Sequence, residues 1–315
     1  MDIYSIGEMV IDFIPGAEPN SYVKNAGGAP ANVAIAVAKN GLDAGMCCSL
    51  GEDDFGHFLY DCLIENNVRC LKNGFTDKAI TTMAFVTLDK DGDRSFTFAR
   101  KPGADMFLEE DDVKESDVDK SYVVHASSCS LSASPIDKAT EKLLRLGYEK
   151  NKLVSFDLNY RNLMWNDDKE ACAKAVLNIL KYVDLLKVSE DELPMLVTGE
   201  ENVSELMKKY NITLVIETLG SKGARCFYNG EMFDIPGLKV KCVDATGAGD
   251  SFWGAFLSYL RFNNIENSKS LNKELIIKAA KYGNASGAIC VQSKGAIPSI
   301  PTREQIEKML SDNNE

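Results

Sequence analysis

The sequence predicts an α/β protein with a doubly wound, mostly parallel sheet, helices on both of its faces, and a small additional β-sheet. First, apolar strand-like runs alternate with helical ones through most of the 315 residues, a pattern typical of a parallel sheet covered by helices. Second, 45% of the residues are hydrophobic, enough for one large core or two small ones. Third, two stretches in the first third of the chain break the alternation. We find no internal repeat and no low-complexity linker, so we expect a single domain over residues 1–315.

The alternating elements follow one another from residue 45 onward, each strand preceding a helix. The first three pairs are Gly45–Leu50 with Phe55–Asn66, Leu153–Leu158 with Lys169–Tyr182, and Leu185–Val188 with a helical turn at Glu190–Leu196. The chain then continues with a strand at Leu214–Thr218, a hairpin at Asn229-Gly230, and helices at Ala248–Phe262 and Asn272–Val291.

The two stretches outside this rhythm are Ile11–Tyr22, which has the pattern of a strand and a turn, and Thr81–Ala99, which has the pattern of a hairpin turning at Asp91-Gly92. We expect them to form a small antiparallel sheet, with strands from about 11–25 and 75–105, that serves as a lid, as a dimerisation surface, or as both. The alternative is that they are edge strands of the main sheet.

Composition excludes several classes of protein. A formal net charge of −12 argues against binding to nucleic acid or to an anionic membrane, both of which favour clustered Lys and Arg. A nucleotide ligand stays compatible, because a helix N-terminus and a metal ion can hold phosphate. No run approaches the roughly 18 apolar residues of a membrane span. The nine cysteines form no C-x-x-C pair and most lie in apolar segments, which is typical of reduced thiols, so we expect a cytoplasmic protein.

The segment with the clearest chemistry is a Gly-Ala-Gly turn, Gly247-Ala248-Gly249, that leads into a helix apolar on nearly every side. The unpaired N–H groups of that first turn and the helix dipole form an anion hole suited to a transferring phosphoryl group. Asp250 stands at the same place and could accept the proton of an attacking hydroxyl. The alternative is that Asp250 or Ser251 only caps the helix. Neither a P-loop nor a dinucleotide fingerprint is present, which disfavours a dehydrogenase.

Two separated segments carry a family resemblance. Asp244-Ala-Thr-Gly-Ala-Gly-Asp250 resembles the C-terminal signature of the PfkB (ribokinase-like) carbohydrate kinases, and Gly27-Gly28-Ala29-Pro30-Ala31-Asn32 resembles their N-terminal signature. They lie more than two hundred residues apart, in the family's order, and the resemblance covers essentially the whole chain. It implies a doubly wound α/β domain with a β lid, ATP as co-substrate, and Asp250 as the catalytic base beside the Gly247, Ala248 and Gly249 amides.

The resemblance also implies a sugar-binding set: Asp12, Gly27, Gly28, Asn32, Arg100, Asn159 and Arg161. On the residues alone, Gly27-Gly28 could be only a strand-to-helix turn, Asp12 only a solvated acid, and Asp157-Leu-Asn159-Tyr-Arg161 only a surface salt-bridge cluster. The branch indicated is that of the fructokinases. Ala29-Pro30-Ala31 stands where ribokinases have Lys-Gly-Ala, and the run from Arg94 through Arg100 to Met106 resembles one common in fructokinases.

A nucleotide set follows from the same resemblance: Ser189, Thr218, Gly220, Gly223 and Asn284. The alternatives are an ordinary turn at Gly220 and plain helix packing at Asn284. Ser189 replaces the Asn of the family's N-x-x-E element, whose Glu192 is retained and is expected to organise Mg²⁺ through water. The residues Asp244, Thr246, Gly295 and Ser299 match a monovalent-cation loop, so we expect activation by K⁺.

The leading interpretation is ATP-dependent phosphorylation of a primary hydroxyl of D-fructose to give fructose 6-phosphate. Kinases of 2-keto-3-deoxygluconate, ribose or a nucleoside are the near alternatives, and a non-catalytic sugar or nucleotide sensor is the alternative of a different class. A homodimer through the lid is a family-level expectation. His57 and His125 are given no functional role.

Overall fold

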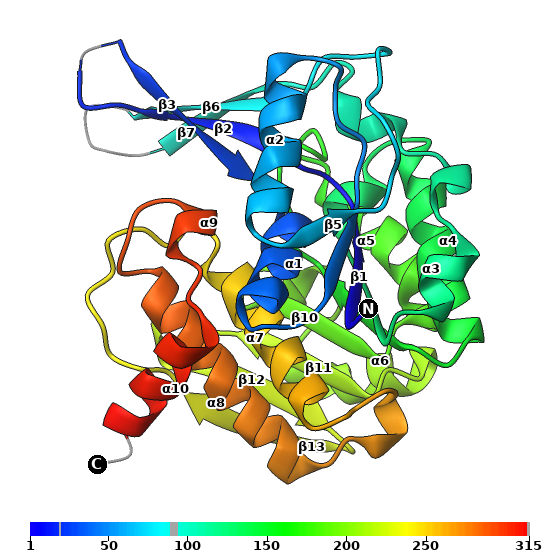
Figure 1. Ribbon diagram of the computed structural model, residues 1–315. Coiled ribbons are helices and arrows are strands. Elements are labelled where there is room, and N and C mark those ends of the chain that lie inside the picture. Colours follow the sequence, from blue (N-terminus) through cyan, green and yellow to red (C-terminus); the bar gives the residue numbers. More distant parts are fainter. Residues whose placement is uncertain (19, 89–93, 314–315) are drawn as a thin grey trace.

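The computed structural model describes residues 1–18, 20–88 and 94–313 and contains two sheets (Figure 1). The larger has nine strands in the order β13-β12-β11-β10-β9-β8-β1-β4-β5. Their bounds are β1 Ile3–Ile6, β4 Ala44–Cys47, β5 Val68–Cys70, β8 Val123–Ser127, β9 Leu153–Asp157, β10 Leu185–Ser189, β11 Leu214–Thr218, β12 Gly223–Tyr228 and β13 Glu231–Pro236. All neighbours pair in parallel except β11 with β12 and β12 with β13, which form the antiparallel edge. The predicted fold class is confirmed.

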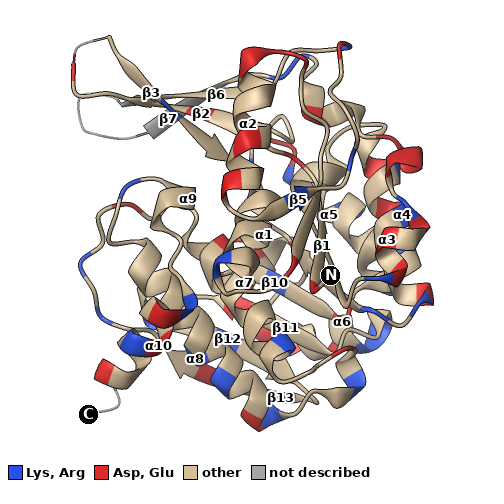
Figure 2. Ribbon diagram, viewed as in Figure 1, with Lys and Arg blue, Asp and Glu red and all other residues tan. Residues whose placement is uncertain are grey.

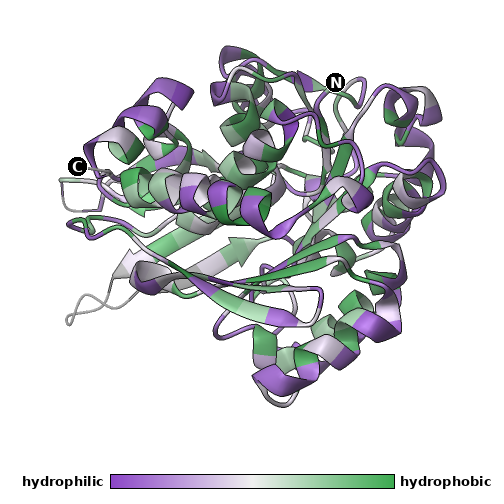
Figure 3. Ribbon diagram, turned by 90° about the horizontal axis from the view of Figure 1, so that it is seen from below, coloured by the Kyte–Doolittle hydropathy of each residue, from purple (hydrophilic) through white to green (hydrophobic). Residues whose placement is uncertain are grey.

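Helices cover both faces of the main sheet, because successive strand residues point to opposite sides. In β1, for example, Ile3 belongs to one apolar core and Tyr4 to the other. The helices of the first core are α1 Ala29–Lys39, α2 Asp54–Glu65, α7 Ala248–Phe262 and α8 Lys273–Cys290. Those on the other face are α3 Glu115–Asp119, α4 Ile136–Glu149, α5 Lys169–Ile179 and α6 Val203–Tyr210. Figure 3 shows the apolar strands enclosed between the helical layers.

Shorter helical segments complete the chain. After α8 come the short α9 Ala296–Ser299 and α10 Arg303–Asp312, which packs on α8. The 3₁₀ turns span Ala104–Phe107, Glu110–Asp112, Ser128–Leu131, Leu180–Tyr182, Leu193–Met195, Glu200–Asn202, Gly220–Lys222 and Ser268–Ser270. The helical turn expected at 190–196 is therefore a single 3₁₀ turn.

Helix α7 is the buried helix that its composition predicts. It packs between α1 and α8, and Trp253 and Phe256 on it are both fully buried and stack with ring centroids 5.0 Å apart. Close packing depends on Gly254, since a Cβ there would lie 2.5 Å from the Cβ of Ala36 in α1. This contact holds the N-terminus of α7 at a constant position relative to α1, and both helices contribute to the site described below.

The smaller sheet has the order β3-β2-β6-β7 and stands off the main body (Figure 1). Its strands are β2 Val10–Pro15, β3 Tyr22–Gly27, β6 Met83–Leu88 and β7 Arg94–Ala99. This excludes the alternative that these segments are edge strands of the main sheet. The sheet is mixed rather than wholly antiparallel, since β2 and β6 run parallel. The turn predicted at Asp91-Gly92 lies outside the described residues.

Charged residues lie mainly on the outer helices, where Lys and Arg are interspersed with the more numerous Asp and Glu (Figure 2). Over the described part of the chain, every helix is too short or too polar to cross a membrane.

His125 lies inside the main sheet and is fully buried, and its Nδ1 is 2.9 Å from the hydroxyl of Ser155. Trp253 Nε1 donates to the same hydroxyl, which connects the imidazole to α7. Burial lowers the pKa of His125 from 6.5 to about 4. The imidazole is therefore a neutral core group, in agreement with its exclusion from the functional residues.

We expect His125 to make the protein acid-labile. Because its folded-state pKa is depressed, the unfolded chain binds a proton that the native state does not as the pH falls from about 6.5 to about 4. This group contributes a loss of about 2 kcal/mol in the free energy of unfolding between pH 7 and pH 5. Urea unfolding of wild type and His125→Asn at both pH values measures it. An equal pH-dependent loss in the two proteins would contradict the assignment.

Candidate active site

A cavity of about 970 Å³ lies between the small sheet and the carboxyl ends of the main strands. The main body contributes residues that follow or end β1, β9, β10 and β11, together with α1 and the start of α7. The small sheet covers it with Asp12, Ile14, Val86 and Phe98. Parallel α/β sheets place their ligands at this edge, outside the carboxyl ends of the strands.

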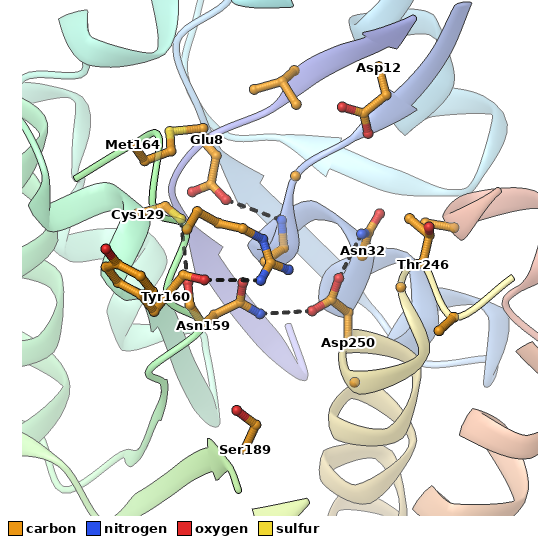
Figure 4. A pocket seen from close by; sticks show the side chains of 18 of the residues that line it. Glu8, Asp12, Asn32, Cys129, Asn159, Tyr160, Met164, Ser189, Thr246 and Asp250 are labelled. Carbon is orange, nitrogen blue, oxygen red and sulfur yellow. Dashed lines mark hydrogen bonds between the residues drawn. The ribbon is translucent and has the colours of Figure 1, made fainter. Parts of the chain in front are cut away.

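Asp250 lies in the first turn of α7 and faces this cavity with only 4% of its surface exposed. Asn32 Nδ2 donates to its Oδ2 at 2.8 Å, and Asn159 Nδ2 donates to its Oδ1 at 3.1 Å (Figure 4). Burial raises the pKa of Asp250 above its ordinary value. These contacts orient the carboxylate into the cavity, and the raised pKa makes it a stronger base than an exposed aspartate.

A buried ion pair lies next to Asp250 and was missed by the sequence analysis. Lys187 Nζ donates to both carboxylate oxygens of Asp157, at 2.9 and 2.7 Å, and both side chains are at least 95% buried. Asn159 Nδ2 also donates to Asp157 Oδ2 at 3.0 Å, which links the pair to Asp250. The available signal was a lysine inside the apolar run Leu185–Val188, since a buried lysine needs an acidic partner.

The Gly-Ala-Gly turn forms the N-terminus of α7, as its sequence predicts. Gly247 is the N-cap in a left-handed conformation, with φ 76°, and a Cβ there would lie 2.6 Å from the Cβ of Ala296. Gly249 lies beside the ion pair, since a Cβ there would be 3.4 Å from Lys187 Nζ. Gly247 and Gly249 line the cavity, and Ala248 is the first residue of the helix. Backbone N–H groups of the first helical turn and the Lys187 ammonium group thus lie together at the N-terminus of α7, where the Ala248 N–H donates to the Ala245 carbonyl at 3.2 Å.

Five of the residues assigned to sugar binding line the cavity: Asp12, Gly28, Asn32, Asn159 and Arg161. Burial raises the pKa of Asp12 to about 6. Gly27 does not line the cavity but supports it, since a Cβ at this position would lie 2.4 Å from Asp12 Oδ2.

Arg100 departs from the expectation. Its Nε donates to Asp105 Oδ2 at 2.9 Å and its Nη1 to Ser132 Oγ at 3.1 Å, and it does not line the cavity among the described residues. The sequence pattern predicted an arginine near the sugar. It could not show that Arg100 forms an ion pair with Asp105, five residues later. Arg100 therefore lies behind the cavity wall rather than in its lining, and its contact with a sugar stays a prediction.

Only some of the residues assigned to nucleotide binding line the cavity. Ser189 and Thr218 line the cavity at the ends of β10 and β11. Gly220, Gly223 and Asn284 lie outside its lining; Asn284 Nδ2 donates to the carbonyls of Ile235 and Pro236 at 3.2 and 3.1 Å. Their contact with a nucleotide stays a prediction.

Hydrogen bonds join three of the four residues of the predicted monovalent-cation set, and Glu192, which is expected to organise Mg²⁺, lines the cavity. Glu192 lines the cavity and accepts from the backbone N–H of Tyr160 at 2.7 Å and of Ser189 at 2.8 Å, so Ser189 positions it. Asp244 Oδ1 accepts from Thr246 Oγ1 at 2.7 Å, and its Oδ2 accepts from Gly295 N at 3.0 Å. Ser299 Oγ donates to the Lys294 carbonyl at 3.2 Å in the same segment. Within the described ranges, no group of three or more His, Cys, Asp or Glu side chains could hold a metal on its own.

Comparison with known proteins identifies the family to which this chain belongs. Over residues 1–303 the chain matches the family described as pfkB family carbohydrate kinase. It is 39% identical to fructokinase-2 of Zea mays, over 99% of this chain and 95% of that protein. This protein belongs to the pfkB family of carbohydrate kinases.

Solved structures show the same similarity. The fructokinase of Xylella fastidiosa with bound ATP superimposes with a TM-score of 0.91 at 29% identity, covering 100% of this chain and 99% of that one. A double mutant of the fructokinase of Vibrio cholerae O395, solved with fructose, ADP and a potassium ion, has a TM-score of 0.87 at 32% identity and 98% coverage of both chains.

Proposed function

We propose that this protein is an ATP-dependent fructokinase that transfers the γ-phosphoryl group of ATP to the 6-hydroxyl of D-fructose. The observation that carries the proposal is the buried carboxylate of Asp250, held by Asn32 and Asn159 at the N-terminus of α7. The similarity to fructokinases over almost the whole chain supports fructose as the sugar.

In this reaction Asp250 accepts the proton of the attacking sugar hydroxyl while the oxygen attacks the γ-phosphorus of ATP and ADP leaves. The amides of Gly247, Ala248 and Gly249 stabilise the charge on the transferring group. The small sheet acts as a lid that excludes water and so limits hydrolysis of ATP. Asp12 comes from this lid, which couples sugar binding to closure.

Two ions are part of the proposal. Carboxylate and hydroxyl oxygens suit both Mg²⁺ and K⁺. Glu192 would hold water of a Mg²⁺ ion that neutralises the β- and γ-phosphates. Asp244, Thr246, Gly295 and Ser299 would hold K⁺, and the bond between Asp244 and Gly295 ties their two segments together. Gly247 of the anion hole packs against Ala296, which follows Gly295. A cation bound by these residues could therefore affect the position of the anion hole.

We expect turnover to depend on a small monovalent cation. Replacing K⁺ with tetramethylammonium should lower kcat several-fold while the thermal midpoint changes little, because the ion shapes the anion hole and does not hold the core together. ADP release at constant ionic strength measures this. Equal rates in the two cations would refute the proposed K⁺ site.

The deciding experiment is ADP release from the purified protein with Mg-ATP and K⁺, across fructose, ribose, 2-keto-3-deoxygluconate, mannose and adenosine. A preference for fructose supports the proposal. Turnover of another sugar would change the proposed substrate but leave the proposed mechanism unchanged. If no sugar or nucleoside of the panel stimulates ADP release although the protein still binds ATP, a sugar or nucleotide sensor is favoured.

Two further properties belong to the proposal. The nine cysteines are all free thiols, which suits the reducing cytoplasm. Tyr22 and Val23 on β3 are 45% and 55% exposed, so the outer strand of the lid offers apolar surface for a homodimer.

A further inference from the structure

Glu8 is a buried acid in the cavity wall to which the site described above gives no role. It follows β1, is 2% exposed and lines the cavity. Its Oε1 accepts from the backbone N–H of Ala29 at 3.2 Å, whereas its Oε2 has no hydrogen-bond partner within the described structure. An unsatisfied buried carboxylate oxygen is costly, so such a group facing a cavity indicates a ligand that satisfies it.

The backbone around Glu8 is held in one position. A Cβ at Gly28, where φ is 123°, would lie 2.4 Å from the Glu8 carbonyl oxygen, and a Cβ at Gly7 would lie 2.6 Å from the Pro30 ring. Substitution at either glycine is therefore blocked, and the segment before Glu8 packs tightly on the start of α1. This rigidity is what a specificity residue requires.

The positive charge of Arg100 lowers the pKa of Glu8, but the ion pair of Arg100 is made with another acid. Arg100 is paired with Asp105, Nη2 to Oδ2 at 2.8 Å, and Asp105 is itself 1% exposed. Burial raises the pKa of Glu8 to about 7, and the Asp105 charge acts in the same direction. Arg100 therefore makes its hydrogen bonds to Asp105 and Ser132 and none to Glu8 Oε2.

Helix α1 sets the distance between Glu8 and the catalytic base. Glu8 binds Ala29 at the first residue of α1, and Asp250 binds Asn32 three residues later. These two attachment points are separated along the helix by about one turn, roughly 5 Å. Figure 4 shows both side chains among those that line the cavity. A single monosaccharide can therefore contact both.

We propose that Glu8 Oε2 accepts a hydrogen bond from a hydroxyl at the anomeric end of fructose, remote from the hydroxyl that Asp250 activates. This inference rests on the proposed function. It makes Glu8 a specificity residue: a site built to bind a hydroxyl rejects analogues that lack it far more strongly than a purely apolar pocket could.

The test uses Glu8→Gln, since the glutamine oxygen can still accept from Ala29 while an amide replaces the free carboxylate oxygen. We expect the KM for fructose to rise about 10- to 100-fold, with the KM for ATP and the thermal midpoint nearly unchanged. The matched control is Glu217→Gln, because Glu217 is also buried, also has an Oε2 without a hydrogen bond in the described part, and lies outside the cavity lining. Its KM for fructose should stay at the wild-type value.

Two analogues identify the hydroxyl. Wild type and Glu8→Gln are compared on 1-deoxy-D-fructose, which lacks the C1 hydroxyl, and on 2,5-anhydro-D-mannitol, which lacks the anomeric hydroxyl. On the analogue without the partner hydroxyl, the two proteins should have the same kcat/KM, because the contact is already missing.

Equal effects of Glu8→Gln on fructose and on both analogues would overturn the assignment, as would a lower thermal midpoint with an unchanged KM for fructose. A wild-type protein inactive on fructose contradicts the proposed function, and the assignment with it. An active wild type whose KM does not respond to Glu8→Gln contradicts the Glu8 assignment alone.

Discussion

Asp250→Asn should lower kcat by about 10³-fold or more, while ATP and fructose still bind with affinities within a few-fold of wild type. The carboxylate is the group that receives the proton of the attacking hydroxyl, and asparagine cannot take that proton at neutral pH. The side chain keeps its size and one acceptor oxygen, so either Asn32 or Asn159 can still donate to it. The loss therefore falls on the chemical step and not on the ground-state complex.

Single-turnover ADP formation and calorimetric titration with ATP separate those two quantities. The thermal midpoint serves as the control for folding, because Asp250 is buried and hydrogen-bonded. Retention of more than about a tenth of the wild-type kcat would remove the general-base assignment. In that case the carboxylate would be a helix cap, the alternative that its position in the sequence leaves open.

The catalytic turn could be predicted because its chemistry is local. Gly247, Ala248, Gly249 and Asp250 are consecutive, and a glycine turn before an apolar helix implies both exposed amides and burial. The alternation of strands and helices predicted the main sheet in the same way, since it depends on short-range periodicity. The separate small sheet followed from two stretches that lack this periodicity.

The partners of the site residues could not be predicted, because they come from distant parts of the chain. Lys187 and Asp157 lie on neighbouring strands, 30 residues apart, and only the register of β9 and β10 places them opposite each other. Glu8 stands in an apolar run and offers no spacing to interpret. Arg100 was assigned to the sugar by resemblance, yet the turn at Gly103 brings Asp105 to its guanidinium. Charge compensation is a property of the folded chain and not of a segment.

Lys187→Met should lower the free energy of unfolding by about 3–5 kcal/mol, because it leaves the Asp157 carboxylate buried without a counter-charge. Asp157 is fully buried and accepts from Asn159, which also donates to Asp250, so one amide group would link the uncompensated charge to Asp250. Urea unfolding at pH 7 measures the loss. A change below about 1 kcal/mol would show that the pair contributes little to stability.

The double variant Asp157→Asn/Lys187→Met separates stability from catalysis. Removing both charges takes away the uncompensated carboxylate, so most of the lost stability should return. Turnover should not return with it, because the ammonium lies beside Gly249, where the transferring phosphoryl group gains charge. We expect kcat of the double variant to stay about 10²-fold below wild type. Recovery of both quantities together would mean that Lys187 serves only to neutralise Asp157, and that the amides of α7 are sufficient for the phosphoryl group.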